Sequence, residues 1–480
     1  MNFKNKYTIM FIAILIFAIA IRAYFFFITQ NQVPFWDELE FLNHAKHIVY
    51  NTPDTGWLEI RPIIFPLLLS AFYFWGIGII GVKVLWLLIS ILGIFLVYLV
   101  GKKLFDEKVA LIATAIYSVF YLDIFYAMRM LVDMPSAVIS LFVVYCMLNR
   151  DKKIFALLMF PVLAFGILLK FNLAVMLPII FSYLILTEGF SFMKLKKFWA
   201  SIGLGFLVAL PYFIYSFNKW GNPLYSFIGA SVKAPRYESI SSVFMQYITY
   251  FPNYIYTVFL VLFFIGAIIL LKIFLIPELI RKEKELKSKL LIILWVIITF
   301  VGFGVLVNHF EDRYIITVFP AIFYTIGLGF RFIYSVIAKY SKIIAIIAVV
   351  GLLIFGGLPL AKYTDNVIKS KLTAYSGLKL AGEWIKENSY EKDNIISSAV
   401  PQITYYSERA TYHYPENGSD FEETIGKYNP KFMVLSIWEK SPDWVYNYPL
   451  KYNNSIIPVQ AWFQNKEQTQ LDTVIYQILQ

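Results

Sequence analysis

The sequence predicts a polytopic all-α membrane protein with about 11 transmembrane helices, followed by a C-terminal soluble α/β domain. Composition gives the first reason: 59% of the 480 residues are hydrophobic and 15% are charged, whereas charged residues make up about 25% of a soluble domain. The mean hydropathy of +0.66 is the second reason. The third is that apolar tracts such as 9–28 and 84–100 approach the roughly 20 residues that a helix needs to cross a bilayer.

The first apolar run, 7–29, is too long for the apolar part of a signal peptide, and no small-residue cleavage site follows it. We therefore interpret it as a membrane anchor. Residues 30–78 form a long first loop. Within that loop, 63–75 is apolar but too short to span, which predicts an interfacial or re-entrant helix with Pro62 at its first position. The ten further predicted spans are 79–100, 109–127, 134–148, 154–170, 172–187, 198–217, 251–271, 290–307, 314–335 and 343–360.

The net charge of +11 indicates membrane orientation rather than nucleic-acid binding, because the basic residues gather in alternate connecting segments. The segments on the side of the N-terminus carry 19 Lys and Arg, and those on the other side carry 7. Basic loops face the cytoplasm. The sequence thus predicts a multi-pass protein of the cell membrane with a cytoplasmic N-terminus. The first loop and the C-terminus are then extracytoplasmic.

Composition changes near residue 362, where polar residues become more frequent and apolar runs shorten. This change predicts a transmembrane domain over 1–362 and an extracytoplasmic α/β domain over 363–480. Within the second domain we expect an amphipathic helix at 378–388 and strands at 394–398, 431–436 and 473–480.

Two adjacent carboxylates, Asp37 and Glu38, follow the first span among aromatic residues. Ionisable groups at the edges of spans are costly and are therefore functional candidates. On the same predicted side lie Arg61, Arg129, Asp133, Lys170, His309 and Arg313. Arg and Lys suit a lipid phosphate, and a carboxylate can take the proton of an acceptor hydroxyl during sugar transfer.

Several stretches together resemble the C-type membrane glycosyltransferases of the protein O-mannosyltransferase and lipid A aminoarabinose-transferase superfamily. They run in that family's order and are Asp37-Glu38 with Phe41 and Ala45, Arg61-Pro62 to Leu68, Gly101 to Phe105, Arg129 to Asp133-Met134-Pro135, Leu168 to Phe171, and Asp312-Arg313-Tyr314. The resemblance covers about 8–185 and, more loosely, 308–322. Met134 separates Asp133 from Pro135, and Phe41 stands where many members have Tyr.

The resemblance implies transfer of a sugar from a polyprenyl-phosphate donor to a protein, lipid or glycan acceptor at the outer face. It implies Asp37 as the base or as a carboxylate that orients the acceptor, Glu38 as its partner and Arg61 as a phosphate ligand. Lys170 and Arg313 would assist at the phosphate. Arg129, Asp133 and His309 would support the site.

Structural interpretations of these residues stay open. Asp37 and Glu38 also suit a helix N-terminus, Arg129 and Asp133 an ion pair closing a turn, and Lys170 a side chain reaching the interface. The acidic pair has the oxygen ligands that Mg²⁺ or Mn²⁺ prefer, but no spacing is diagnostic of a metal site. A secondary transporter or lipid-linked sugar flippase is the main competitor, since transporters also carry charges within the membrane. A sensor or scaffold whose C-terminal domain binds glycans is the third reading.

Overall fold

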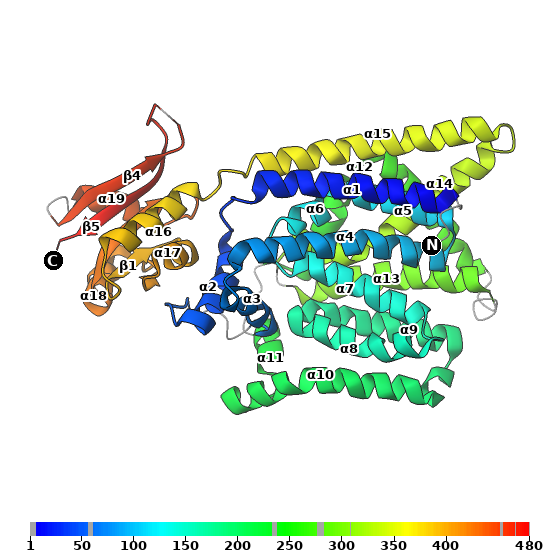
Figure 1. Ribbon diagram of the computed structural model, residues 1–480, viewed down its shortest axis with the longest axis horizontal. Coiled ribbons are helices and arrows are strands. Elements are labelled where there is room, and N and C mark those ends of the chain that lie inside the picture. The colour runs from blue at the N-terminus through cyan, green and yellow to red at the C-terminus, as the bar shows by residue number, and fades with distance from the viewer. Residues whose placement is uncertain are drawn as a thin grey trace. The chain divides into compact units, whose positions relative to one another are not determined.

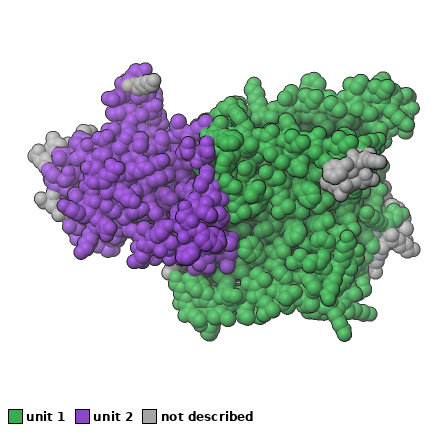
Figure 2. Space-filling view, in the orientation of Figure 1, with its two compact units in different colours: residues 1–28, 60–62, 83–369 green, residues 29–59, 63–82, 370–480 purple. Residues whose placement is uncertain are grey.

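The computed structural model describes residues 6–55, 61–232, 238–275, 283–307, 309–451, 455–465 and 467–479. These residues divide into two compact units, coloured separately in Figure 2. Unit 1 comprises 1–28, 60–62 and 83–369, and unit 2 comprises 29–59, 63–82 and 370–480. The first loop is therefore grouped with the C-terminal region. The division into a membrane domain ending at 362 and an outer domain stays a prediction.

Unit 1 is built from long apolar helices, several of which run in nearly the same direction (Figure 1). Its helices are α1 (Lys6–Thr29), α4 (Gly78–Leu104), α5 (Glu107–Ser118), α6 (Tyr121–Ala127), α7 (Asp133–Leu148), α8 (Lys153–Leu169), α9 (Met176–Glu188), α10 (Lys196–Trp220), α11 (Tyr225–Val232), α12 (Ile240–Leu271), α13 (Lys284–Leu306), α14 (Phe319–Ile337) and α15 (Lys342–Lys369). Short 3₁₀ segments η2 (Phe171–Val175), η3 (Ser191–Lys194), η4 (Lys272–Leu275) and η6 (Asp312–Val318) extend or join them.

Each of the eleven predicted spans is largely helical, and the span 109–127 is divided between two helices, α5 and α6. Among the described residues, eight helices are long and apolar enough to cross a membrane, and α5 with α6 makes a ninth if this pair, bent by 54°, is one span. The two remaining segments, α7 and α8, are shorter than these. The polytopic helical fold is thus confirmed, whereas the count of eleven crossings stays a prediction.

Helices α12 and α14 approach each other closely because glycine removes the side chain at two contacts. A Cβ at Gly266 would clash with the carbonyl oxygen of Thr325, and a Cβ at Gly329 would clash with that of Leu262. Small residues allow such close helix packing in membrane proteins. Helix α14 also packs against α5, α13 and α15.

Unit 2 contains two helices of the first loop, α2 (Trp36–Tyr50) and α3 (Ile64–Phe74), and the C-terminal α/β domain. Helix α3 begins at Ile64 with Ile63 as its N-cap. Pro62 thus precedes the helix, and the prediction that it occupies the first helical position is wrong.

The C-terminal domain has a five-stranded sheet in the order β2-β1-β3-β5-β4. Strand β1 is parallel to β2 and β3, whereas β5 is antiparallel to β3 and β4. The elements are α16 (Ser376–Asn388), β1 (Asn394–Ser397), α17 (Val400–Ser407), β2 (Thr411–Tyr412), η7 (Gly418–Asp420), α18 (Phe421–Tyr428), β3 (Pro430–Ser436), α19 (Asp443–Lys451), β4 (Ile456–Phe463) and β5 (Leu471–Ile478). The predicted helix and all three predicted strands are present, and the sequence did not indicate β2 and β4.

Successive strand residues point to opposite faces of this sheet and enter separate cores. Ile395 and Val434 pack with α16 and α17. Their neighbours Ile396 and Leu435 instead join the core that contains Phe421 of α18. Helices therefore cover both faces, as expected for an α/β domain.

Candidate active site

The acidic pair lies in the first turn of α2. The backbone N–H of Phe35 donates to Glu38 Oε2 at 2.7 Å, so Glu38 satisfies a donor that the helix start leaves unpaired. Glu38 is buried, with 1% of its surface exposed, whereas Asp37 is half-buried. The pair thus has two distinct environments, and Asp37 is the more accessible carboxylate.

Polar contacts hold α2 against α17 of the C-terminal domain. Asn43 Nδ2 donates to the carbonyl oxygen of Pro401 at 2.9 Å, in buried surroundings. Lys46 Nζ lies 2.5 Å from Glu408 Oε1. Burial opposes ionisation of Glu408, but Lys386 and Lys46 outweigh it and lower the pKa of this carboxyl. The helix that carries Asp37 is therefore fixed to the C-terminal domain.

Helix α3 makes a further contact with the same domain. The hydroxyls of Tyr73 and Tyr405 lie 2.8 Å apart, and burial raises the pKa of Tyr405 to about 12. Both hydroxyls are then protonated at neutral pH and form a neutral hydrogen bond. The rings of Phe41 and Phe65 pack edge to face with their centroids 4.7 Å apart, and this contact joins α2 to α3.

The histidines of α2 form hydrogen bonds within the first loop. His44 Nδ1 lies 2.7 Å from Asp54 Oδ2, and His47 Nδ1 lies 2.6 Å from the carbonyl oxygen of Thr52. Burial of Asp54 is outweighed by His44 and His47, and the pKa of its carboxyl is lowered. In the part of the chain that the structure describes, no three His, Cys, Asp or Glu side chains are grouped as metal ligands. The use of Mg²⁺ or Mn²⁺ by Asp37 and Glu38 stays a prediction.

In unit 1, Lys170 forms an ion pair with Asp133, whose side chain is 4% exposed. Asp133 begins α7, and Lys170 follows the last residue of α8. The turn before α7 is held by Trp86, whose Nε1 donates to the carbonyl oxygen of Leu131 at 2.7 Å. Two predicted site residues, distant in sequence, are thus in direct contact.

A second group of charges surrounds Glu311, between α13 and η6. His309 Nε2 lies 2.8 Å from Glu311 Oε1, and Arg313 pairs with Oε2 of the same carboxylate. Burial opposes ionisation of Glu311, but the charge of Arg313 and hydrogen bonds from Arg313 and His309 outweigh it. The pKa of Glu311 is therefore lowered.

Tyr314 connects the two charged groups. Lys170 Nζ lies 5.4 Å from the centroid of its ring, and the guanidinium carbon of Arg313 lies 5.8 Å from it. The structure thus brings Lys170 and Arg313 to one aromatic ring. The guanidinium of Arg129 lies over the ring of Phe125, at 4.9 Å.

Asp312 is a half-buried carboxylate that belongs to the Asp312-Arg313-Tyr314 stretch of the resemblance but has no role in the predicted site. It accepts hydrogen bonds from the hydroxyls of Tyr121 and Tyr126 of α6. Three consecutive charged residues at the start of a span, Glu311 to Arg313, were the available signal. The two tyrosines lie within the predicted span 109–127, whose sequence does not indicate a contact with Asp312.

Deeper in unit 1, Arg22 and Asp123 form a fully buried ion pair. Ser90 donates to Asp123 Oδ2 at 2.7 Å, and Tyr117 donates to Oδ1 at 2.6 Å. Arg22 also donates to the carbonyl oxygen of Ser118 at 3.0 Å. The network satisfies a backbone carbonyl at the break between α5 and α6. It also joins this break to α1 through Arg22 and to α4 through Ser90.

The predicted residues are divided between the units. Asp37 and Glu38 belong to unit 2, and Arg61, Arg129, Asp133, Lys170, His309 and Arg313 belong to unit 1. Within unit 1, Asp133 and Lys170 meet, as do His309 and Arg313 through Glu311. Arg61 is half-buried and directly precedes Pro62.

Comparison with known proteins identifies the architecture. Residues 61–215, about a third of the chain, match the family model of dolichyl-phosphate-mannose-protein mannosyltransferases. A solved structure of ArnT from Cupriavidus metallidurans, bound to undecaprenyl phosphate, is similar over 98% of this chain and 97% of that one, with a TM-score of 0.61. The chain has the fold of the membrane glycosyltransferases.

The sequence identity with ArnT is 12%. AglB, the oligosaccharyltransferase of Archaeoglobus fulgidus, shares the glycosyltransferase fold with 13% identity and a TM-score of 0.61 in a complex with an inhibitory peptide and a dolichol-phosphate. The match covers 91% of this chain and 70% of that one. No curated protein sequence gives a significant match. The predicted resemblance and fold class are confirmed.

Proposed function

We propose that the chain is an integral membrane glycosyltransferase that moves a sugar from a polyprenyl-phosphate donor, of the dolichyl or undecaprenyl type, to an acceptor at the outer face of the membrane. The fold likeness to ArnT carries the proposal, because it extends over nearly the whole of both chains. That protein was solved with undecaprenyl phosphate, and AglB was solved with a dolichol-phosphate. Two neighbours of this fold thus bind the class of lipid that we propose for the donor.

The donor phosphate would be bound by cations of unit 1. Lys170 and Arg313 approach one ring, that of Tyr314, and Arg61 adds a further guanidinium to the proposed set. Each of Lys170 and Arg313 already contacts a carboxylate, Asp133 or Glu311. A bound phosphate would either replace these carboxylates or bind beside them, through charge-assisted hydrogen bonds from Lys170 and Arg313. Arg129 and His309 would support the site without a direct role in the chemistry.

Asp37 would act as the general base. The acceptor hydroxyl oxygen attacks the anomeric carbon, the bond from that carbon to the phosphate oxygen breaks, and polyprenyl phosphate leaves as an anion. The acceptor proton passes to the carboxylate of Asp37. The cations that bind the phosphate would stabilise the negative charge that develops on it as it leaves. Direct displacement of this kind inverts the configuration of the sugar carbon.

Glu38 would position Asp37 rather than take the proton itself. Its carboxylate accepts from the backbone N–H of Phe35 and is almost fully buried. This contact fixes the first turn of α2, which contains Asp37. The C-terminal domain would fix the other end of the same helix through Asn43 and Lys46.

The distribution of basic residues supports an N-terminus in the cytoplasm and a C-terminal domain over 363–480 outside the cell. The acceptor would then approach from the aqueous phase. Protein, lipid and glycan acceptors stay open; AglB was solved with an acceptor peptide containing an NVT sequon. The sugar itself is a hexose or a pentose.

The proposal is tested with purified protein in nanodiscs, a polyprenyl phosphate carrying a radiolabelled sugar, and envelope membranes from cells that lack the protein. Transfer of the label from the organic phase to a membrane acceptor, with release of polyprenyl phosphate, is the expected result. Movement of intact labelled lipid across proteoliposomes without any covalent transfer would instead show a flippase. Adding EDTA, then Mg²⁺ or Mn²⁺, tests whether a divalent cation is needed.

A further inference from the structure

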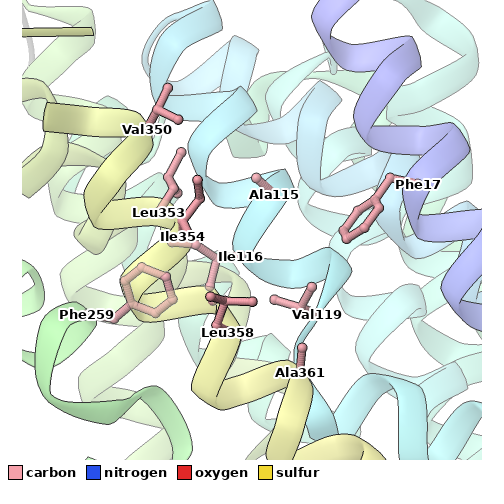
Figure 3. Close-up of a pocket in the computed structure, with 11 residues that line it drawn as sticks. Phe17, Ala115, Ile116, Val119, Phe259, Val350, Leu353, Ile354, Leu358 and Ala361 are labelled. Carbon is pink, nitrogen blue, oxygen red and sulfur yellow. The ribbon is translucent and has the colours of Figure 1, made fainter. Parts of the chain in front are cut away.

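An apolar groove runs along unit 1 between α1 and α15. It consists of two adjoining cavities with volumes of about 370 and 350 Å³. Ala115, Val350 and Leu353 line both cavities, so the two form one continuous groove. Figure 3 shows Ala115 of α5 and Val119, which follows the end of α5, between Phe17 of α1 and the apolar side chains of α15.

The groove is long enough for an extended hydrocarbon chain. Its wall on α15 extends from Ile346 to Ala361, or about 22 Å at 1.5 Å per residue. One leaflet contributes roughly 15 Å to a hydrocarbon core of about 30 Å. A lipid tail entering at one end would therefore remain in contact with the groove along its whole length.

Among the described residues, three cationic side chains line the groove: Lys6, Lys108 and Arg331. All three belong to the cavity of about 370 Å³, so they lie toward one end of the groove. Arg331 pairs with Glu285 at 2.9 Å and Asp106 at 3.4 Å. Neither lysine pairs with a carboxylate among the residues that the structure describes.

The two lysines instead lie over aromatic rings. Lys6 Nζ is 5.1 Å from the ring centroid of Tyr7, and Lys108 Nζ is 4.5 Å from that of Tyr334. Both lysines are exposed. This end of the groove therefore offers two accessible ammonium groups to an anion.

We propose that the groove binds an anionic phospholipid, with its phosphate at Lys6 and Lys108 and one acyl chain between α1 and α15. The charge pattern selects this occupant, because the apolar walls suit a hydrocarbon tail and the lysines suit a negatively charged headgroup. A zwitterionic lipid lacks the net charge. The bound lipid would hold α15 against α1 and α5.

This site is distinct from the proposed donor site. Arg313 of η6 and Arg331 of α14 lie near opposite ends of one candidate span, Asp312–Ile337. Their separation is about 27 Å at 1.5 Å per residue, which is nearly the thickness of the hydrocarbon core. The phospholipid headgroup and the donor phosphate would thus lie at opposite membrane faces.

The test uses the purified full chain in detergent and measures binding of phosphatidylglycerol by native mass spectrometry and by the shift in unfolding temperature. Phosphatidylglycerol is expected to stabilise the protein, whereas phosphatidylcholine and inorganic phosphate are not. The double variant Lys6→Gln/Lys108→Gln should bind about 30-fold more weakly, since each basic residue contributes about 1 kcal/mol. The matched control Lys152→Gln/Lys153→Gln removes two exposed lysines outside the groove and should bind normally.

A second variant tests the tail without changing charge. Val350→Trp fills the junction of the two cavities from a position that is 47% exposed, so folding should be unaffected. It should weaken binding of long-chain phosphatidylglycerol and leave that of the dihexanoyl lipid unchanged. Equal stabilisation by phosphatidylcholine, or normal binding by both groove variants, would overturn the proposal, and so would stabilisation by inorganic phosphate alone.

Discussion

Lys170 and Asp133 form an ion pair in which the side chains are 14% and 4% exposed. Because Asp133 is almost fully buried, removal of Lys170 alone leaves an uncompensated carboxylate, and this costs roughly 3–5 kcal/mol. A single substitution at Lys170 would therefore disturb both folding and donor binding. The role of Lys170 in the proposed phosphate site must be measured with its partner changed as well.

Lys170→Met should lower both the unfolding temperature and the rate of sugar transfer. The double variant Lys170→Met/Asp133→Asn removes the unpaired charge and should recover most of the stability. Its KM for the donor should nevertheless stay about tenfold above the wild-type value, because a phosphate contact is lost. Recovery of the donor KM in the double variant would assign Lys170 a structural role only.

Arg22→Met should destabilise unit 1 by roughly 3–5 kcal/mol, since it leaves Asp123 charged and buried. The double variant Arg22→Met/Asp123→Leu should unfold closer to the wild-type temperature. Thermal unfolding in detergent measures both variants. A single variant as stable as wild type would show that the pair does not fix the break between α5 and α6.

Acid should weaken the contacts around Glu311. Its folded-state pKa is lowered from the ordinary value of 4.5, so its contribution to stability is complete above about pH 4.5 and is lost as the pH falls below that value. Glu311→Gln should unfold at a lower temperature than wild type at pH 7, and the difference should shrink toward pH 3. A constant difference over this range would contradict the assigned ion pairs with Arg313 and His309.

Asn43→Leu should reduce kcat by at least about tenfold while leaving the donor KM unchanged, because it frees the helix that positions Asp37 from α17. Asn388→Leu is the matched control. Asn388 Nδ2 also donates to a backbone carbonyl, that of Trp384 at 2.8 Å, but on the exposed surface of α16. Equal effects of the two substitutions on kcat would argue against positioning by the C-terminal domain.

The sequence predicted the apolar helices well because each is marked by a continuous local pattern of composition. The sequence-based prediction was inaccurate where a helix begins before the apolar stretch, or where a helix breaks within that stretch. Helix α12 begins at Ile240, before the apolar run expected from residue 251, and the segment expected to be one helix over 109–127 bends by 54°. The bend is stabilised by contacts of Arg22 and Asp123, and no local pattern reveals a partner that lies 101 residues away.

The candidate site could be predicted only in part, because a sequence shows residue types and their order but not the contacts between distant residues. The residue types and their order indicated phosphate and sugar chemistry, but the pairing of Lys170 with Asp133 depends on packing between α7 and α8. The capping contact of Glu38 was one of the interpretations left open by the sequence, and it is present. The attachment of α2 to α17 joins residues more than 350 positions apart, and no local sequence pattern in either segment predicts this contact.

The central claim is that Asp37 removes the acceptor proton during transfer from a polyprenyl-phosphate donor. The most direct measurement compares wild type with Asp37→Asn in the labelled-sugar transfer assay, with donor binding measured in parallel by photocrosslinking. We predict that Asp37→Asn binds the donor normally and transfers sugar about 10²–10⁴-fold more slowly. Transfer by Asp37→Asn at the wild-type rate would contradict the account.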